Sequence, residues 1–205
     1  KKIDALGRIT QWQYNANGNV ANQINPDGND IAWTYNSFGQ KLTETDENNN
    51  TQTYIYDSNG LLTQVIDAKG NNQWFGYDEL WRLTEVIDGR GTSTNDADHT
   101  TYTVYDDADR VISVSGPITS QSYEYDPIGN KTKFTNGRGY NTLYEYDNNS
   151  NLTRVARIVP SDPNQVTEYT YDSMDRKISM INPNGNVTDY EYDALGRMTK
   201  EINPE

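Results

Sequence analysis

The chain has 205 residues, a net charge of −13 and no cysteine. The negative charge disfavours nucleic acids and anionic membrane surfaces as partners, and the lack of cysteine excludes disulfides, thiolate catalysis and cysteine-ligated zinc. Only 33% of the residues are hydrophobic, but 16 are Tyr and 4 are Trp. Because such rings bury large areas while keeping a polar tip, we expect a β-rich protein with thin cores.

A tyrosine recurs about every 21 residues, usually as the second Tyr of a Y-x-Y-D motif, and serves as the anchor of a repeat. The anchors are Tyr14, Tyr35, Tyr56, Tyr77, Tyr105, Tyr125, Tyr146, Tyr171 and Tyr192. The longer intervals after Tyr77 and Tyr146 indicate insertions. An active site is normally built once, so a recurring motif indicates a structural unit. We expect one array of about nine units over residues 1–205, a fragment of a longer protein, with "DALGR" at 4–8 as the remnant of an earlier copy.

The first element of each unit is a strand that ends at the anchor. Eight of the nine residues two positions before the anchors are aromatic: Trp12, Trp33, Tyr54, Phe75, Tyr123, Tyr144, Tyr169 and Tyr190, with Thr103 as the exception. A spacing of two places side chains on one face of a strand. The strand therefore carries an aromatic pair on one face, and the residues between the pair, such as Glu124, Glu145 and Glu191, point to the other face.

A turn follows each anchor. Asp or Asn stands directly after the anchor, as at Asp57, Asp126 and Asp193, and Gly often stands three residues later, as at Gly18, Gly39, Gly60, Gly129 and Gly196. Asp or Asn can bond its own backbone in a turn, and Gly supplies the positive φ that closes it. Arginine follows in several copies, at Arg82, Arg110, Arg176 and Arg197. We expect it to pair with the aspartate of its turn.

The second strand begins six residues after the anchor. Apolar residues stand six and ten residues after it, as at Leu62 and Ile66, and their parity predicts a shared face. Intervening apolar residues break the alternation at Val65, Val86, Val114, Phe134 and Val155. Either both faces are partly covered or a β-bulge shifts the register. A second turn follows, with sequences such as "NPDGN" at 25–29 and "NPNGN" at 182–186.

One such hairpin cannot bury its aromatic face alone, so successive hairpins are expected to stack side by side. The predicted fold is all-β, a spiralling antiparallel sheet of stacked β-hairpins, because strands twist. The sequence shows neither a membrane-spanning apolar stretch nor a signal peptide, and we expect no membrane insertion.

Two segments, "YEYDALGRMTKEINPE" at 190–205 and "YDSMDRKISMINPNGNVTDYEY" at 171–192, resemble the YD repeat of the Rhs family. That family includes bacterial Rhs polymorphic toxins, a wall-associated protein of Gram-positive bacteria, the B/C components of insecticidal toxin complexes, and teneurins. The resemblance covers essentially the whole chain. It implies a hollow shell that encloses a C-terminal toxin domain in an exported or cell-surface bacterial protein. The expected partners are neighbouring YD repeats and that cargo domain, and no cofactor is implied.

Family members that release a cargo carry an aspartyl autoprotease with a D-P-x-G motif and a glycine-rich stretch after it. This chain has "DPIG" at 126–129, but it lies in register with the repeat turns and continues "NKTKFTNG". We expect an ordinary turn there.

Other chemistry receives less support from the sequence. The carboxylates Asp126, Asp147 and Asp193 recur because the turn needs them, which disfavours a glycosidase pair. His99 is the single histidine; with Asp96 and Asp98 it could ligate a metal, but it cannot make a usual triad of zinc or iron ligands. "DENNN" at 46–50 and "DDAD" at 106–109 do not fit an EF-hand loop.

The main prediction is therefore a non-catalytic repeat scaffold that encloses or presents another domain. The alternative is an adhesion module that binds glycans or a receptor through exposed aromatics, with Trp12, Trp33, Trp74 and Trp81 as candidate sugar platforms. A hydrolase is the weakest reading, because no unique polar constellation stands out. A shell predicts a downstream cargo, adhesion predicts an outward aromatic patch, and hydrolysis predicts a single non-periodic acid cluster.

Overall fold

The structure is a computed structural model that describes residues 1–90, 96–160 and 162–203, without the side chains of 162–164. The chain forms two compact units, Lys1–Tyr102 and Thr103–Glu205. The first unit holds β1 (Lys2–Ile3), β2 (Ile9–Tyr14), β3 (Val20–Ile24), β4 (Asp30–Tyr35), β5 (Lys41–Thr45), β6 (Thr51–Tyr56), β7 (Leu62–Ile66), β8 (Asn72–Tyr77), β9 (Leu83–Ile87) and the start of β10 (Thr100–Tyr105). The second holds β11 (Val111–Gly116), β12 (Thr119–Tyr125), β13 (Lys131–Thr135), β14 (Asn141–Tyr146), β15 (Leu152–Val159), β16 (Asp162–Tyr171), β17 (Lys177–Ile181), β18 (Val187–Tyr192) and β19 (Met198–Ile202).

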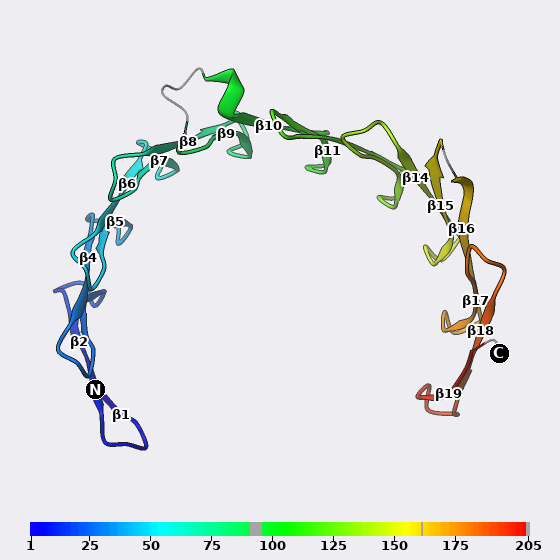
Figure 1. The fold of residues 1–205 in the computed structure, drawn as a ribbon, viewed down its shortest axis with the longest axis horizontal. Coiled ribbons are helices and arrows are strands. Elements are labelled where there is room, and N and C mark those ends of the chain that lie inside the picture. Colours follow the sequence, from blue (N-terminus) through cyan, green and yellow to red (C-terminus); the bar gives the residue numbers. More distant parts are fainter. Residues whose placement is uncertain (91–95, 161, 204–205) are drawn as a thin grey trace. The chain divides into compact units, whose positions relative to one another are not determined.

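Within each unit the strands pair antiparallel with their neighbours in sequence, and Figure 1 shows the strands following one another in chain order. The only helical segment in the described residues is a three-residue 3-10 turn, η1 (Ala97–His99). No helix in the described part of the chain is long and apolar enough to cross a membrane. The predicted all-β fold of stacked antiparallel hairpins is thus confirmed.

In eight of the anchor hairpins the described ladder contains a β-bulge one residue into the second strand. Tyr56 lies opposite Leu62 and Ile55 lies opposite Gln64, which leaves the residue between as the bulge. The same shift follows the other anchors in the described ladders, and the bulged residues are Ala21, Leu42, Thr63, Thr84, Thr132, Thr153, Ile178 and Thr199. The bulge accounts for part of the broken alternation, and every residue of the second strand β7 is half-buried, so both alternatives hold: a bulge shifts the register, and both faces are partly covered.

The bulge also corrects one prediction from parity. Residues six and ten after an anchor do not share a face. Leu62 and Val65 lie opposite the aromatic pair Tyr56 and Tyr54, whereas Ile66 lies opposite Thr53 on the other face. The apolar residue nine positions after the anchor is therefore the one that packs beside the aromatic row, as Phe134 does with Tyr123, their ring centroids 5.4 Å apart.

Most hairpins pair with one another over a shorter ladder than the strands within a hairpin, and the ladders β11–β12 and β15–β16 are exceptions. Strands β5 and β6 pair only from Thr43 opposite Thr53 to Thr45 opposite Thr51. The residues nearer the anchor turns lie beyond this ladder. Few side chains are buried: Ile87, 2% exposed, and Ala156, 6% exposed, are the only buried hydrophobic residues in the described part of the chain. Such burial is typical of a single-layer sheet with a thin core, as predicted.

Candidate functional site

Seven anchor tyrosines each tie their hairpin to the preceding one. The hydroxyl donates a hydrogen bond to the carbonyl of the residue that stands six positions after the previous anchor. The bonds run from Tyr35 to Val20, Tyr56 to Lys41, Tyr77 to Leu62, Tyr125 to Val111, Tyr146 to Lys131, Tyr171 to Leu152 and Tyr192 to Lys177, at 2.7–3.0 Å. These bonds lie beyond the short ladder between hairpins, so each hydroxyl supplies a contact that the backbone does not make.

Tyr14, the first anchor, differs from these seven. Its side chain is 62% exposed, and no described residue accepts a hydrogen bond from its hydroxyl. Burial raises the pKa of Tyr77, Tyr146 and Tyr171.

The aspartates after the anchors close their turns as expected. At the last turn, Asp193 Oδ1 accepts the backbone N–H groups of Leu195 and Arg197, both at 2.9 Å, and Oδ2 accepts Arg197 Nε at 2.7 Å. Asp57 and Asp126 accept the corresponding backbone bonds. These contacts lower the pKa of the Asp193 carboxyl, the backbone and side-chain bonds from Arg197 being the largest causes.

The turn glycines have the positive φ that the sequence predicts: 84° at Gly60, 101° at Gly129 and 79° at Gly196. Four turns lack Gly at this position, and Trp81, Asp109, Ser150 and Asp175 occupy it with φ of 58–67°. The "DPIG" segment has the geometry of an ordinary anchor turn, with Gly129 N–H donating to the Asp126 carbonyl at 3.1 Å. "DALGR" at 4–8 joins β1 to β2, so it occupies the place of a second turn, not of an anchor turn.

Arginine does more than brace its own turn. Arg110 and Arg176 pair with Asp106 and Asp172, as predicted, at 2.6–2.7 Å. Each guanidinium also lies over the ring of the next anchor, 4.7 Å from Tyr125 and 4.9 Å from Tyr192. Each donates as well to the carbonyl of the next turn, at 3.3 Å to Asp126 and 3.4 Å to Asp193. Sequence reasoning missed this link between hairpins.

Lysines extend the aromatic row between anchors. Lys131 lies 5.9 Å from the ring of Tyr123 and 5.0 Å from that of Tyr144. Lys177 lies in the same way between Tyr169 and Tyr190, at 5.8 and 4.4 Å. Cation–π contacts of this kind stabilise by about 0.5–1 kcal/mol at exposed sites.

The opposite face of the second unit carries ion pairs. Glu124, Glu145 and Glu191 lie on this face, as predicted, and they pair across the hairpin with Lys133 at 2.8 Å, Arg154 at 2.5 Å and Lys200 at 3.7 Å. The glutamates are largely exposed, and pairs of this kind contribute little to stability.

The remaining candidate residues do not come together. His99 Nδ1 lies 3.0 Å from Asp96 Oδ1, and the described residues contain no group of three acidic or histidine side chains suited to a metal. The four tryptophans are scattered. Trp12 and Trp33 lie in the aromatic row, Trp74 lies opposite Ile87 on the other face, and Trp81 is exposed in a turn.

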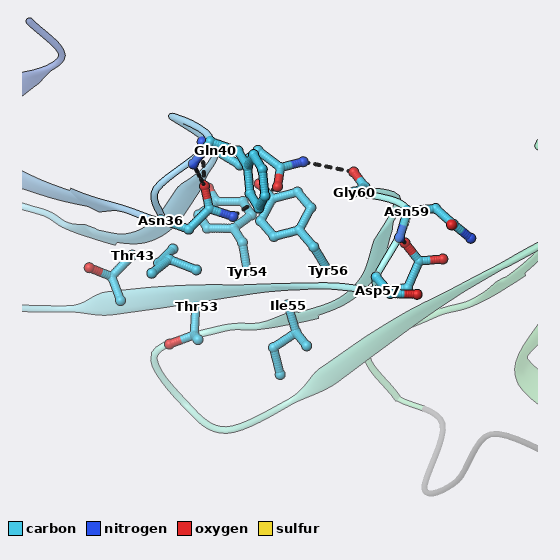
Figure 2. Close-up of a pocket in the computed structure, with 13 residues that line it drawn as sticks. Asn36, Gln40, Thr43, Thr53, Tyr54, Ile55, Tyr56, Asp57, Asn59 and Gly60 are labelled. Carbon is cyan, nitrogen blue, oxygen red and sulfur yellow. Dashed lines mark hydrogen bonds between the residues drawn. The ribbon is translucent and has the colours of Figure 1, made fainter. Parts of the chain in front are cut away.

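A hollow of about 780 Å³ lies between the anchor turns 36–40 and 57–60. Figure 2 shows Tyr54 and Tyr56 on one side of β6, and Thr53 and Ile55 on the other. Phe38, 88% exposed, and Leu42 also line the hollow. Two of its amides are bonded internally, because Asn36 Nδ2 donates to Gln40 Oε1 at 2.8 Å and Gln40 Nε2 donates to the Gly60 carbonyl at 2.7 Å.

The RHS repeat family model matches residues 14–51, 35–72, 56–93 and 178–205, together more than half of the chain. The fold is similar to a crystal structure of TcdB2-TccC3 without its hypervariable C-terminal region, with a TM-score of 0.67, 16% identity and 96% of this chain covered. It is also similar to the Tc holotoxin pore of Photorhabdus luminescens, with a TM-score of 0.55, 15% identity and 98% covered. This chain spans only 11% and 14% of those chains. No curated protein matches the sequence.

Proposed function

Because the chain belongs to the RHS repeat family, we propose that it forms part of the wall of a shell that encloses a cargo domain of the same exported bacterial protein. The observation that carries the proposal is the repeated bond from each anchor hydroxyl to the preceding hairpin. A contact that recurs at a fixed position lets a sheet extend by adding identical units. We further propose that this segment is structural and non-catalytic.

The anchor positions support this role through three contacts that the same few residues provide. The tyrosine ring covers one face, its hydroxyl joins the neighbouring hairpin, and the arginine of the preceding turn lies on the ring. At Tyr192 all three contacts are present, with Lys177 as acceptor and Arg176 over the ring. The wall therefore needs no second layer to hold its hairpins in register.

Electron microscopy of the intact parent protein tests the proposal. We expect a hollow particle whose wall is a single layer of strands, with density for a cargo inside. An open strip with no enclosed space would overturn the proposal.

Glycan binding remains an untested prediction. A sugar site needs amides free to bond hydroxyls beside an aromatic face, and the amides of Asn36 and Gln40 at the hollow beside Phe38 are already bonded within the protein. Calorimetric titration with common monosaccharides and oligosaccharides would test it directly.

A further inference from the structure

The turn after β13 contains an asparagine that is followed directly by a glycine. Asn136 opens this turn, and Gly137 is the next residue. The backbone nitrogen of a residue can attack the side-chain amide of an asparagine before it, and glycine favours this reaction because it has no side chain to hinder the approach. Three more such pairs occur in the chain, Asn17–Gly18, Asn59–Gly60 and Asn184–Gly185, and all of them lie at the tips of turns.

The amide carbonyl of Asn136 is held in a reactive arrangement. Its Oδ1 accepts the backbone N–H groups of Arg138 at 2.9 Å and of Tyr140 at 3.0 Å. Attack at the amide carbon turns this oxygen into an oxyanion, and donors that are already in place stabilise an oxyanion. The two bonds also hold the side chain folded over the Gly137 peptide, which they span.

The attacking nitrogen and its surroundings are open. Gly137 is exposed, and no described residue accepts a hydrogen bond from its N–H. A hollow of about 510 Å³ borders Asn136 and Gly137, which gives water access to the amide. The glycine also has a packing reason, because a Cβ added at this position would lie 3.3 Å from the Ser120 carbonyl oxygen.

The other three asparagine–glycine pairs differ in both respects. Their glycine N–H groups are bonded to the carbonyl of the residue that opens the turn. These bonds run from Gly18 to Asn15 at 3.0 Å, from Gly60 to Asp57 at 3.1 Å and from Gly185 to Asn182 at 2.9 Å. No described residue donates a hydrogen bond to the side-chain oxygens of the three asparagines. The folded chain therefore distinguishes Asn136 from them.

The turn after β9 shows the product that such a reaction would give. It has the sequence D-G-R at 88–90, where the turn after β13 has N-G-R at 136–138. Asp88 accepts the backbone N–H of Arg90 at 2.9 Å and pairs with its guanidinium at 2.6 Å. No described carboxylate pairs with Arg138, so an aspartate at position 136 would find a cation in the same place.

We propose that Asn136 is a site of spontaneous deamidation. The Gly137 nitrogen bonds to Asn136 Cγ, the Cγ–Nδ2 bond breaks, and the Gly137 N–H proton leaves with Nδ2 as ammonia. Water then opens the cyclic imide at either of its carbonyls, which gives aspartate or isoaspartate. This inference goes beyond the proposed function and does not depend on it, because the chemistry needs only one turn of the second unit.

Peptide mapping by mass spectrometry of the chain aged in a mildly alkaline buffer tests the proposal. Asn136 should deamidate about tenfold or more faster than Asn17, Asn59 and Asn184, since one hydrogen bond changes a rate by roughly that factor. In urea that unfolds the chain, the four rates should converge. Equal rates in the folded chain, or the same preference for Asn136 in urea, would overturn the proposal.

The chain offers matched controls in turns of the same geometry. Asn15 Oδ1 also accepts two backbone N–H groups, both at 3.0 Å, so Ala16→Gly should make Asn15 deamidate about as fast as Asn136. Asn182 Oδ1 accepts two such groups at 2.9 and 3.1 Å, but the nitrogen of Pro183 has no hydrogen and Asn182 should stay intact. An unreacted Asn15 in the Ala16→Gly variant would contradict the role of the turn geometry.

Discussion

Removal of a single anchor hydroxyl is expected to loosen one junction between hairpins. Tyr56→Phe keeps the ring and deletes the donor to the Lys41 carbonyl, a bond of 2.9 Å. Tyr14→Phe is the matched control, because Tyr14 has the same position in its repeat and no acceptor among the described residues. The two variants therefore lose the same atom, and only one of them loses a hydrogen bond.

The expected cost of Tyr56→Phe is about 1 kcal/mol, the usual net value of one such bond. Tyr14→Phe should cost close to nothing. In urea unfolding followed by circular dichroism, a loss of about 1 kcal/mol lowers the midpoint by roughly 0.3–1 M at an unchanged slope. Equal midpoints for the two variants would refute the view that the hydroxyls hold the hairpins together.

Further predictions concern the turns and the partly buried tyrosines. Gly60→Ala should destabilise the fold more than Gly18→Ala in the same urea assay. Both glycines have a φ above 80°, but a Cβ added at Gly60 would lie 3.1 Å from the Gln40 side chain, whereas a Cβ added at Gly18 would contact no atom within 4 Å. Equal losses of stability in the two variants would contradict this prediction. Trp81→Gly should stabilise by about 1 kcal/mol, because it removes a non-glycine residue from the left-handed region; an unchanged thermal midpoint would argue against such strain. The turn aspartates Asp106, Asp172 and Asp193 have a lowered pKa and therefore stabilise the fold above about pH 4. The free energy of unfolding should fall as the pH drops below that value. A free energy of unfolding that stays constant between about pH 4 and 2 would contradict these turn contacts. Absorbance at 295 nm should show tyrosines that ionise above about pH 10, and titration of every tyrosine at or below that pH would contradict the burial of Tyr77 and Tyr146.

Local chemistry made the turns predictable from sequence. Asp or Asn followed by Gly specifies a turn by bonds within five residues, and the observed contacts of Asp193 and the φ of Gly196 follow that logic. The spacing of two also correctly placed the aromatic pair on one face. These features depend only on residues close in sequence.

Contacts between hairpins were not predictable in the same way. The acceptor of each anchor hydroxyl is a backbone carbonyl, which every residue has, so no residue type marks it. The bulge places Leu62 and Val65 on one face although they stand three residues apart, and the adjacent apolar residues Val65 and Ile66 reflect partial cover of both faces. The sequence alone does not separate these two effects. The second role of Arg110 and Arg176, over the next anchor ring, depends on the distance between hairpins, which only the structure supplies.

Protease protection in the intact parent protein tests the central claim most directly. A tag placed downstream of the repeats would be followed during limited proteolysis. If the repeats form an enclosing wall, the tagged region survives until the repeats themselves are cut or unfolded. If the tag is digested at once while the repeats persist, the repeats enclose nothing there and the account is contradicted.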